Sequence, residues 1–282
     1  MKTIRVIPRL DIKGPNLVKG IHLEGLRVLG SPADFAQYYY EQGADELMFM
    51  DVVASLYERN SLHEIITETA KKIFIPLTVG GGLRTLDDIK SVLRAGADKV
   101  CLNTAAIKNP EIIREASLRF GSSTIVVAIE AIKQQNGDYL AYTDNGREHT
   151  GVNVLDWARK MNEYGAGELV VTSVDKEGTG EGYDVDLVNL ISMNVNIPVI
   201  AHGGAGKASD VLDVINTGKA DAVALSSILH YDYVSKHKNA EQNTSEGNYE
   251  FLKNKKSFNG LETTTIGELK NYLVSKNINC RI

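Results

Sequence analysis

Residues 75–82 read IPLTVGGG and residues 197–204 read IPVIAHGG, so an apolar run that ends in small residues occurs twice. A second pair of segments has a similar offset of about 120 residues, GADEL at 43–47 and GAGEL at 165–169. Repetition at a fixed spacing is typical of duplicated supersecondary units. The chain is therefore expected to consist of two similar halves.

The apolar pattern around these segments alternates between short runs typical of strands and longer runs typical of helices. The expected strands are Arg5–Asp11, Glu46–Asp51, Pro76–Val79, Lys99–Asn103, Thr124–Glu130, Glu168–Ser173, Pro198–Ala201 and Ala222–Ser226. Alternating strands and helices predict a parallel sheet, and eight strands fit a closed barrel better than an open sheet. The expected fold is therefore an α/β (β/α)8 TIM barrel, a single domain over residues 1–282 built from two half-barrel repeats.

Capping residues mark the starts of several helices, because each is followed by proline or by an acid in the first turn. These starts are Ser31-Pro32, Ser61 with Glu64, Thr85 with Asp88, and Asn109-Pro110. Residues 233–263 break the pattern with a polar composition, before a last helix expected at Thr265–Lys276. We interpret this stretch as an insertion on the face where the βα loops gather, either a solvated linker or a contact for another protein.

The composition, 43% hydrophobic and 24% charged, is typical of a folded soluble chain and excludes a disordered or disulfide-stapled one. The formal net charge of −5 argues against general binding to nucleic acid or to an anionic membrane. A cytoplasmic location is expected, because the sequence has neither a membrane-spanning run nor a signal peptide. Cys101 and Cys280 make no metal-binding pattern, so neither a metal nor another cofactor is expected.

Charged residues stand at the starts of four expected strands, where strand alternation points them into the barrel. They are two cations and two anions: Arg5, Glu46, Lys99 and Glu168. Buried charges need partners, and a ring of ion pairs provides them. Two interpretations stay open, a structural polar plug at the bottom of the barrel and a gate across a route through it.

Two carboxyl groups lie where this fold places catalytic residues, at the carboxyl ends of strands. Asp11 follows the first strand and Glu130 ends the fifth, and these strands lie opposite each other in an eight-stranded ring. Such a pair can divide the roles of acid and base when its surroundings separate the two pKa values. We expect the two to be catalytic; the structural alternative for each is a loop carboxylate bonded to backbone.

Glycines after strands in both halves predict two phosphate sites, because backbone N–H groups and helix N-termini there can bind anions. The next strands end in hydroxyl or amide donors. The predicted phosphate-binding residues are Gly81, Gly82, Asn103, Thr104, Gly178, Gly203, Gly204, Ser226 and Ser227. Since the arrangement occurs in both halves, a substrate with two phosphates is expected.

These residues resemble the cyclase-subunit family (HisF) of imidazole glycerol phosphate synthase. The most specific stretches are Arg9–Lys13, Val18–Gly20, Asp45–Asp51, Thr78–Gly82, Gly96–Ala106, Thr172–Tyr183 and Ile197–Gly206. The resemblance implies a lyase of histidine biosynthesis that forms a heterodimer with a glutaminase subunit (HisH-like) docked at the bottom of the barrel. It also implies that the four charged residues form a gate for ammonia, which passes through the interior to Asp11 and position 130.

The resemblance implies the reaction as well. Ammonia reacts with a ribulosyl-formimino-aminoimidazole carboxamide ribonucleotide, a bisphosphate, to give imidazole glycerol phosphate and aminoimidazole carboxamide ribonucleotide. This chain departs from the family at Glu130, where Asp is usual, and at Arg9, where a small residue is usual. An unpaired buried guanidinium is too costly to keep, so Arg9 is predicted to pair with Glu130 or with another inward acid.

These departures keep a second interpretation open, a cyclase-like paralogue. It would channel ammonia to a separate sugar amidotransferase that makes acetamidino sugars for surface polysaccharide, and the 233–263 insertion would contact that third protein. An unrelated phosphate-sugar isomerase or a plain binding barrel is the remaining alternative.

Overall fold

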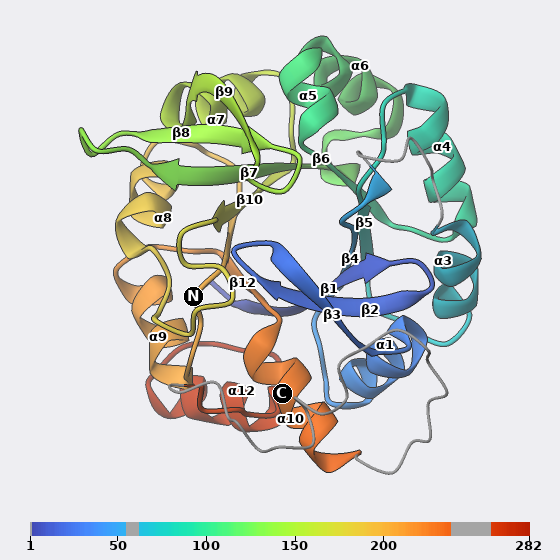
Figure 1. The fold of residues 1–282 in the computed structure, drawn as a ribbon, viewed down its shortest axis with the longest axis vertical. Helices are drawn as coiled ribbons and strands as arrows, with labels where there is room; N and C mark the ends of the chain where they lie inside the picture. Colours follow the sequence, from blue (N-terminus) through green and yellow to red (C-terminus); the bar gives the residue numbers. More distant parts are fainter. Residues whose placement is uncertain (1, 55–61, 238–260) are drawn as a thin grey trace.

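Parallel strands form a closed ring in the computed structural model, which describes residues 2–54, 62–237 and 261–282 (Figure 1). The strands of the ring, in order around it, are β1 (Arg5–Lys13), β4 (Leu47–Asp51), β5 (Leu77–Gly80), β6 (Lys99–Leu102), β7 (Ile125–Lys133), β10 (Glu168–Ser173), β11 (Val199–His202) and β12 (Ala222–Leu225). Parallel pairing of β12 with β1 and of β7 with β10 closes the ring. The predicted TIM barrel is confirmed, with each expected strand in place.

Two antiparallel hairpins extend the ring and were not predicted. The first is β2 (Asn16–Ile21) with β3 (Glu24–Gly30), which continues from β1, and the second is β8 (Tyr139–Thr143) with β9 (Glu148–Asn153), which continues from β7 (Figure 1). Their outer strands β3 and β9 are largely exposed. They therefore lack the apolar runs by which the barrel strands were recognised.

Helices cover the outside of the ring (Figure 1). Their bounds are α1 (Pro32–Glu41), α3 (His63–Ala70), α4 (Leu86–Ala95), α5 (Thr104–Lys108), α6 (Glu111–Phe120), α7 (Val154–Glu163), α8 (Val185–Ser192), α9 (Ala208–Asn216), α10 (Ser227–Lys236) and α12 (Ile266–Ser275), with a 3-10 turn at Ser122–Thr124. None of the described helices is both long and apolar enough to cross a membrane.

The predicted helix starts have mixed outcomes. Thr85 and Thr265 form capping boxes, in which each hydroxyl accepts a backbone N–H and the acid three residues later accepts the N–H of the threonine. Ser31 is the N-cap of α1 with Pro32 at the first helical position, as predicted, although its side chain makes no capping hydrogen bond. Pro110 rather than Asn109 is the N-cap of α6. The N-cap of α3 is Leu62 rather than Ser61, which lies outside the described residues.

The expected insertion at 233–263 begins too early, because α10 continues to Lys236. Residues 238–260 of this stretch lie outside the described residues, so the insertion remains a prediction.

The repeat is visible in matching hydrogen bonds. Leu77 N–H donates to the Asp98 carboxylate (2.9 Å), and Val199 N–H donates to the Asp221 carboxylate (2.8 Å). Gly81 and Gly203 both have positive φ values, +96° and +91°, in the left-handed region where glycine carries little strain. A Cβ on Gly81 would lie 2.2 Å from the Asp51 carbonyl oxygen, and one on Gly203 would lie 2.8 Å from that of Ser173. Corresponding positions in the two halves thus have the same backbone geometry.

The interior of the ring contains a small apolar cluster, separate from the main core between strands and helices. Its buried members are Ile7, Met48, Cys101, Val126, Ala128, Val170, Ile200, Ala222 and Ala224. Ile7, Met48, Cys101 and Val170 lie two residues after Arg5, Glu46, Lys99 and Glu168, so strand alternation puts them on the same inward face. The cluster fills the middle of the barrel with side chains, as is usual for this fold.

Candidate active site

The two predicted catalytic carboxyls belong to opposite strands of the ring. Asp11 lies on β1 and Glu130 on β7, and three strands separate them in either direction. Asp11 is 3% exposed, and Glu130 is half-buried. Gly146, in the turn between β8 and β9, donates its N–H to Glu130 Oε2 (2.8 Å). The second hairpin therefore folds back over the rim and helps to orient Glu130.

Arg9 connects Asp11 to the far side of the barrel. Its Nε donates to Asp11 Oδ1 (2.9 Å), and its Nη1 donates to His202 Nδ1 (3.1 Å) and, more weakly, to Thr172 Oγ1 (3.4 Å). The prediction that Arg9 pairs with an inward acid is confirmed, and the acid is Asp11 rather than Glu130. Because arginine has only donors, His202 Nδ1 is the acceptor, which assigns the ring proton to Nε2.

Burial dominates the electrostatics of these groups. It raises the pKa of Glu130 to about 7, although the Gly146 N–H, Arg9 and Asn103 act in the opposite direction. Burial, with help from Arg9, lowers the pKa of His202 well below its usual range, so the imidazole is neutral near pH 7. Burial also opposes the charge on Arg9, but the carboxylates of Asp11, Glu177 and Glu130 together outweigh it and raise the pKa of Arg9. Glu130 can thus exchange a proton near neutral pH, as general acid–base catalysis requires.

The raised pKa of Glu130 predicts a pH dependence of stability. Between about pH 4.5, where an unfolded glutamic acid loses its proton, and about pH 7, only the unfolded state gains by ionising, so the free energy of unfolding should fall with rising pH. In Glu130→Gln, the free energy of unfolding, measured by urea titration at several pH values, should lack the part of this fall that comes from Glu130. Glu148→Gln, on exposed β9, is the matched control and should keep the parent slope. Identical pH curves for the parent and Glu130→Gln would contradict the prediction.

The predicted phosphate-binding residues form two groups on opposite sides of the barrel rim. Gly81, Gly82, Asn103 and Thr104 follow β5 and β6, whereas Gly203, Gly204, Ser226 and Ser227 follow β11 and β12. Each group lies between the positions of Asp11 and Glu130 around the ring. Gly178, the remaining predicted residue, lies in the loop after β10 against the first hairpin, where an added Cβ would lie 2.7 Å from the Gly20 carbonyl oxygen.

Ser226 is already committed inside the protein, because its hydroxyl donates to the Arg9 carbonyl oxygen (2.9 Å). Any contact of Ser226 with a phosphate would therefore use its backbone N–H. Asn103 is likewise engaged, since its side-chain amide donates to the Tyr142 carbonyl oxygen (3.3 Å).

A buried ion pair between Lys19 and Glu177 fastens the first hairpin to the opposite rim. Lys19 lies on β2 and Glu177 in the loop after β10, and each side chain is 2% exposed. Leu23 N–H donates to the second Glu177 oxygen (2.9 Å). Sequence reasoning missed this pair because 158 residues separate its members and no local pattern joins them.

The four charged residues at the starts of strands meet at the bottom of the barrel. Arg5 bonds Glu46 (2.9 Å) and Glu168 (3.0 and 3.2 Å), and Lys99 bonds both of the same carboxylates (2.9 Å each). Thr78, which was not predicted, donates to the remaining Glu46 oxygen (2.5 Å). Each buried charge thus has partners, as its burial demands.

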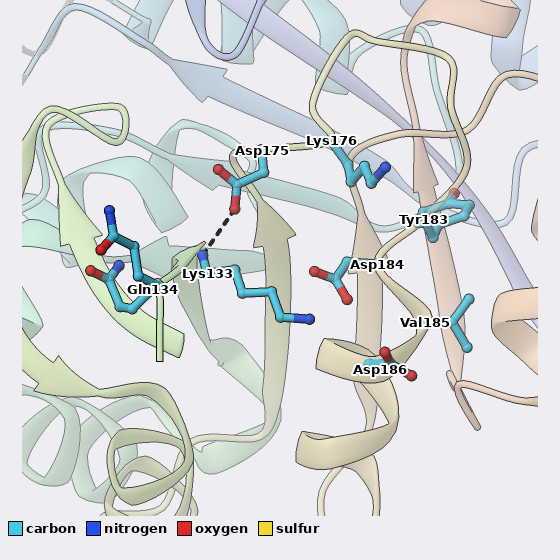
Figure 2. Close-up of a pocket in the computed structure, with 9 residues that line it drawn as sticks. Lys133, Gln134, Asp175, Lys176, Tyr183, Asp184, Val185 and Asp186 are labelled. Carbon is cyan, nitrogen blue, oxygen red and sulfur yellow. Dashed lines mark hydrogen bonds between the residues drawn. The ribbon is translucent and has the colours of Figure 1, made fainter. Parts of the chain in front are cut away.

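A hollow of about 670 Å³ lies outside the barrel interior, between the β7–β8 hairpin and the loop from β10 to α8 (Figure 2). Lys133 N–H donates to Asp175 at its edge (2.9 Å), and Tyr139 donates to Asp184 (3.0 Å). Neither Asp11 nor Glu130 lines this hollow, so it is separate from the candidate site. Within the described ranges, no group of three His, Cys, Asp or Glu side chains is placed to hold a metal ion.

Comparison with known proteins places this geometry in a family context. Residues 5–235 match the family model described as histidine biosynthesis protein. The chain is 58% identical over 210 residues to the imidazole glycerol phosphate synthase subunit HisF of Legionella pneumophila, which covers 74% of this chain and 99% of that protein. It is 48% identical over 232 residues to the subunit of the same name from Lactococcus lactis subsp. lactis (strain IL1403), covering 82% and 90%. With that of Methanocaldococcus jannaschii it shares 46% identity over 250 residues, covering 82% and 92%.

Proposed function

The chain belongs to the histidine biosynthesis protein family, among the HisF subunits of imidazole glycerol phosphate synthase, and from this premise we propose how its barrel works. It is a lyase of histidine biosynthesis, the cyclase subunit of the synthase. We infer that it uses ammonia to convert the ribulosyl-formimino bisphosphate into imidazole glycerol phosphate and aminoimidazole carboxamide ribonucleotide. A cytoplasmic heterodimer with a glutaminase subunit is part of the same proposal.

The observation that carries the proposed chemistry is the arrangement of the rim. Asp11 and Glu130 lie on opposite strands, and the two groups of phosphate-binding candidates lie on opposite strands at about right angles to them around the ring. A substrate with a phosphate at each end would therefore cross the barrel with its middle between the two carboxyls. This placement supports an acid–base role for the pair.

Closing a ring around a nitrogen that comes from ammonia requires that protons leave the attacking nitrogen and reach the leaving group. Glu130, whose pKa is raised by burial to about 7, is suited to deliver a proton. Asp11 is bonded to Arg9 through one oxygen and is assigned as the proton acceptor. The two phosphates hold the substrate so that both proton transfers occur in one fixed geometry. Fixing the reacting groups in this way lowers the entropic part of the activation barrier.

The bottom of the barrel supports docking of a glutaminase subunit. Phe74, Leu118 and Met193 are 82%, 83% and 67% exposed, and all three lie near the ends of segments that lead into the barrel strands. A partner bound at this end would bury these apolar side chains, and burial of apolar surface favours association. They surround the face on which Arg5, Glu46, Lys99 and Glu168 meet, so a partner bound there would release ammonia at the proposed gate.

The deciding experiment supplies the purified protein with the bisphosphate and an excess of ammonium salt, and measures imidazole glycerol phosphate. Formation of the product supports the cyclase proposal. The protein is instead the ammonia-conducting paralogue if no product forms but, once the glutaminase and glutamine are added, ammonia is released in step with glutamine hydrolysis. Failure of both reactions would contradict the proposed use of ammonia.

A coupling measurement tests the gate. Lys99→Ala removes one cation that bridges Glu46 and Glu168, so we expect several-fold fewer products per glutamine hydrolysed in the complex. The measured quantity is the ratio of imidazole glycerol phosphate to glutamate. Lys2→Ala is the matched control, because Lys2 pairs with Asp221 outside the ring and should leave the ratio unchanged. Equal ratios in the two variants would reject the gate.

A further inference from the structure

Arg9 spans the interior of the barrel at the level between the apolar cluster and the rim. It starts on β1 and reaches Thr172 on β10 and His202 on β11, although β12 and β11 stand between β1 and β10 in the ring. Only 3% of its surface is exposed. A long cation in this position is therefore part of the floor of the candidate site.

The surroundings fix the guanidinium from several sides. Asp11 binds Nε, while neutral His202 and Thr172 bind Nη1. Thr172 Oγ1 also contacts His202 Nδ1 (3.1 Å), so the acceptors on the far strands hold one another in place. A guanidinium held in this way has little freedom to turn, since each of its bonds is directional.

Arg9 also acts on the second carboxyl of the pair. It interacts electrostatically with Glu130 as well as with Asp11 and Glu177. Asp144 favours the protonated form of Glu130 and so opposes Arg9. The Gly146 N–H and the Asn103 side chain favour the ionised form, as Arg9 does. Arg9 Nη1 also reaches Thr172, which pairs in register with Glu130 on the neighbouring strand β7, so the guanidinium lies beside the strand that carries the second carboxyl.

We propose that Arg9 is a positioning residue of the reaction, which orients the Asp11 carboxylate and holds its positive charge between the strand of Asp11 and the strands next to Glu130. This inference rests on the proposed acid–base function of the two carboxyls. Asp11 Oδ1 is occupied by Arg9, which leaves Oδ2 as the oxygen for the substrate. Without the guanidinium, Glu130 would hold its proton more strongly and would ionise at a higher pH.

The test compares Arg9→Met, which is similar in length and uncharged, with Arg9→Lys, which keeps the charge. Arg9→Met should lower kcat by on the order of 10²-fold with little change in KM, because Arg9 acts through the carboxyls rather than on the substrate. In a plot of kcat against pH, the change in rate that reports the titration of Glu130 should occur at a higher pH in Arg9→Met than in the parent. In Arg9→Lys, this change in rate should occur near the same pH as in the parent, and part of kcat should be recovered. Arg114→Met, on the exposed surface of α6, is the matched control.

A direct titration keeps the inference testable if turnover or folding fails. The Glu130 carboxyl signal is followed by carbon-13 NMR and identified by its loss in Glu130→Gln. In Arg9→Met, or in Arg9→Gln if Arg9→Met does not fold, the midpoint should move above the parent value. A midpoint that stays at the parent value overturns the inference even when the parent is active. An inactive parent instead overturns the proposed function, while the titration still decides the effect of Arg9.

Discussion

Replacing Asp11 by asparagine is expected to lower the rate of ammonia-dependent cyclisation by about 10²- to 10⁴-fold, the range of a lost general base. The side chain keeps its shape, and its amide oxygen can still accept the Arg9 Nε–H. The variant therefore loses proton acceptance while it keeps this hydrogen bond. Because the buried Arg9 guanidinium loses its anionic partner, the melting temperature is expected to fall as well. Steady-state turnover with saturating ammonium salt and the bisphosphate measures the loss.

The matched control for this prediction is Asp175→Asn. Asp175 lies in the hollow outside the barrel interior, where it accepts the Lys133 backbone N–H (Figure 2). Its substitution should leave the rate within a few-fold of the parent. An Asp11→Asn rate within tenfold of the parent would show that Asp11 is not the proton acceptor.

Truncating Glu46 to alanine is expected to lower the free energy of unfolding by about 3 kcal/mol, at the lower end of the range for breaking a buried ion pair. Glu46 is 1% exposed and accepts hydrogen bonds from Arg5, Lys99 and Thr78, so its removal leaves two partly buried cations to share Glu168. The loss stays at the lower end because Arg5 and Lys99 are partly exposed and can regain some water. Urea unfolding with linear extrapolation provides the measurement.

Glu111→Ala serves as the comparison for Glu46→Ala. Glu111 forms an exposed pair with Arg114 at 3.6 Å, and such surface pairs contribute about 0–1 kcal/mol. Equal losses in the two variants would mean that the ring at the bottom of the barrel does not stabilise the fold. A large loss at Glu46 alone supports its role as the central acceptor of the ring.

Much of the barrel follows from local pattern. The eight strands were found because strands buried on both faces of a parallel barrel are short, nearly continuous apolar runs, and the repeat at 75–82 and 197–204 marked the two halves. Alternation along the strands placed Arg5, Glu46, Lys99 and Glu168 inside the barrel. The two hairpins escaped prediction although β2 and β8 are partly buried; their outer strands β3 and β9 have Gly30 as the one buried residue between them and so carry no apolar run.

Ion pairs and hydrogen bonds across the barrel could not be predicted from local sequence patterns. That Arg9 needed an acid followed from the cost of burying a charge, but the choice of Asp11 over Glu130 came from the folded structure. Lys19 with Glu177, Thr78 with Glu46, and His202 with Arg9 join residues that lie on different strands or loops. Likewise, the folded structure revealed that the Ser226 hydroxyl is used internally.

The amino-acid sequence by itself determined the strand order, the inward-facing positions and the two carboxyls at the rim, because backbone sterics and burial act on neighbouring residues. The tertiary structure alone decided which inward charges meet and how burial raises the pKa of Glu130 to about 7. Those outcomes depend on closure of the ring, which brings segments more than 100 residues apart into hydrogen-bond distance and removes the water between them.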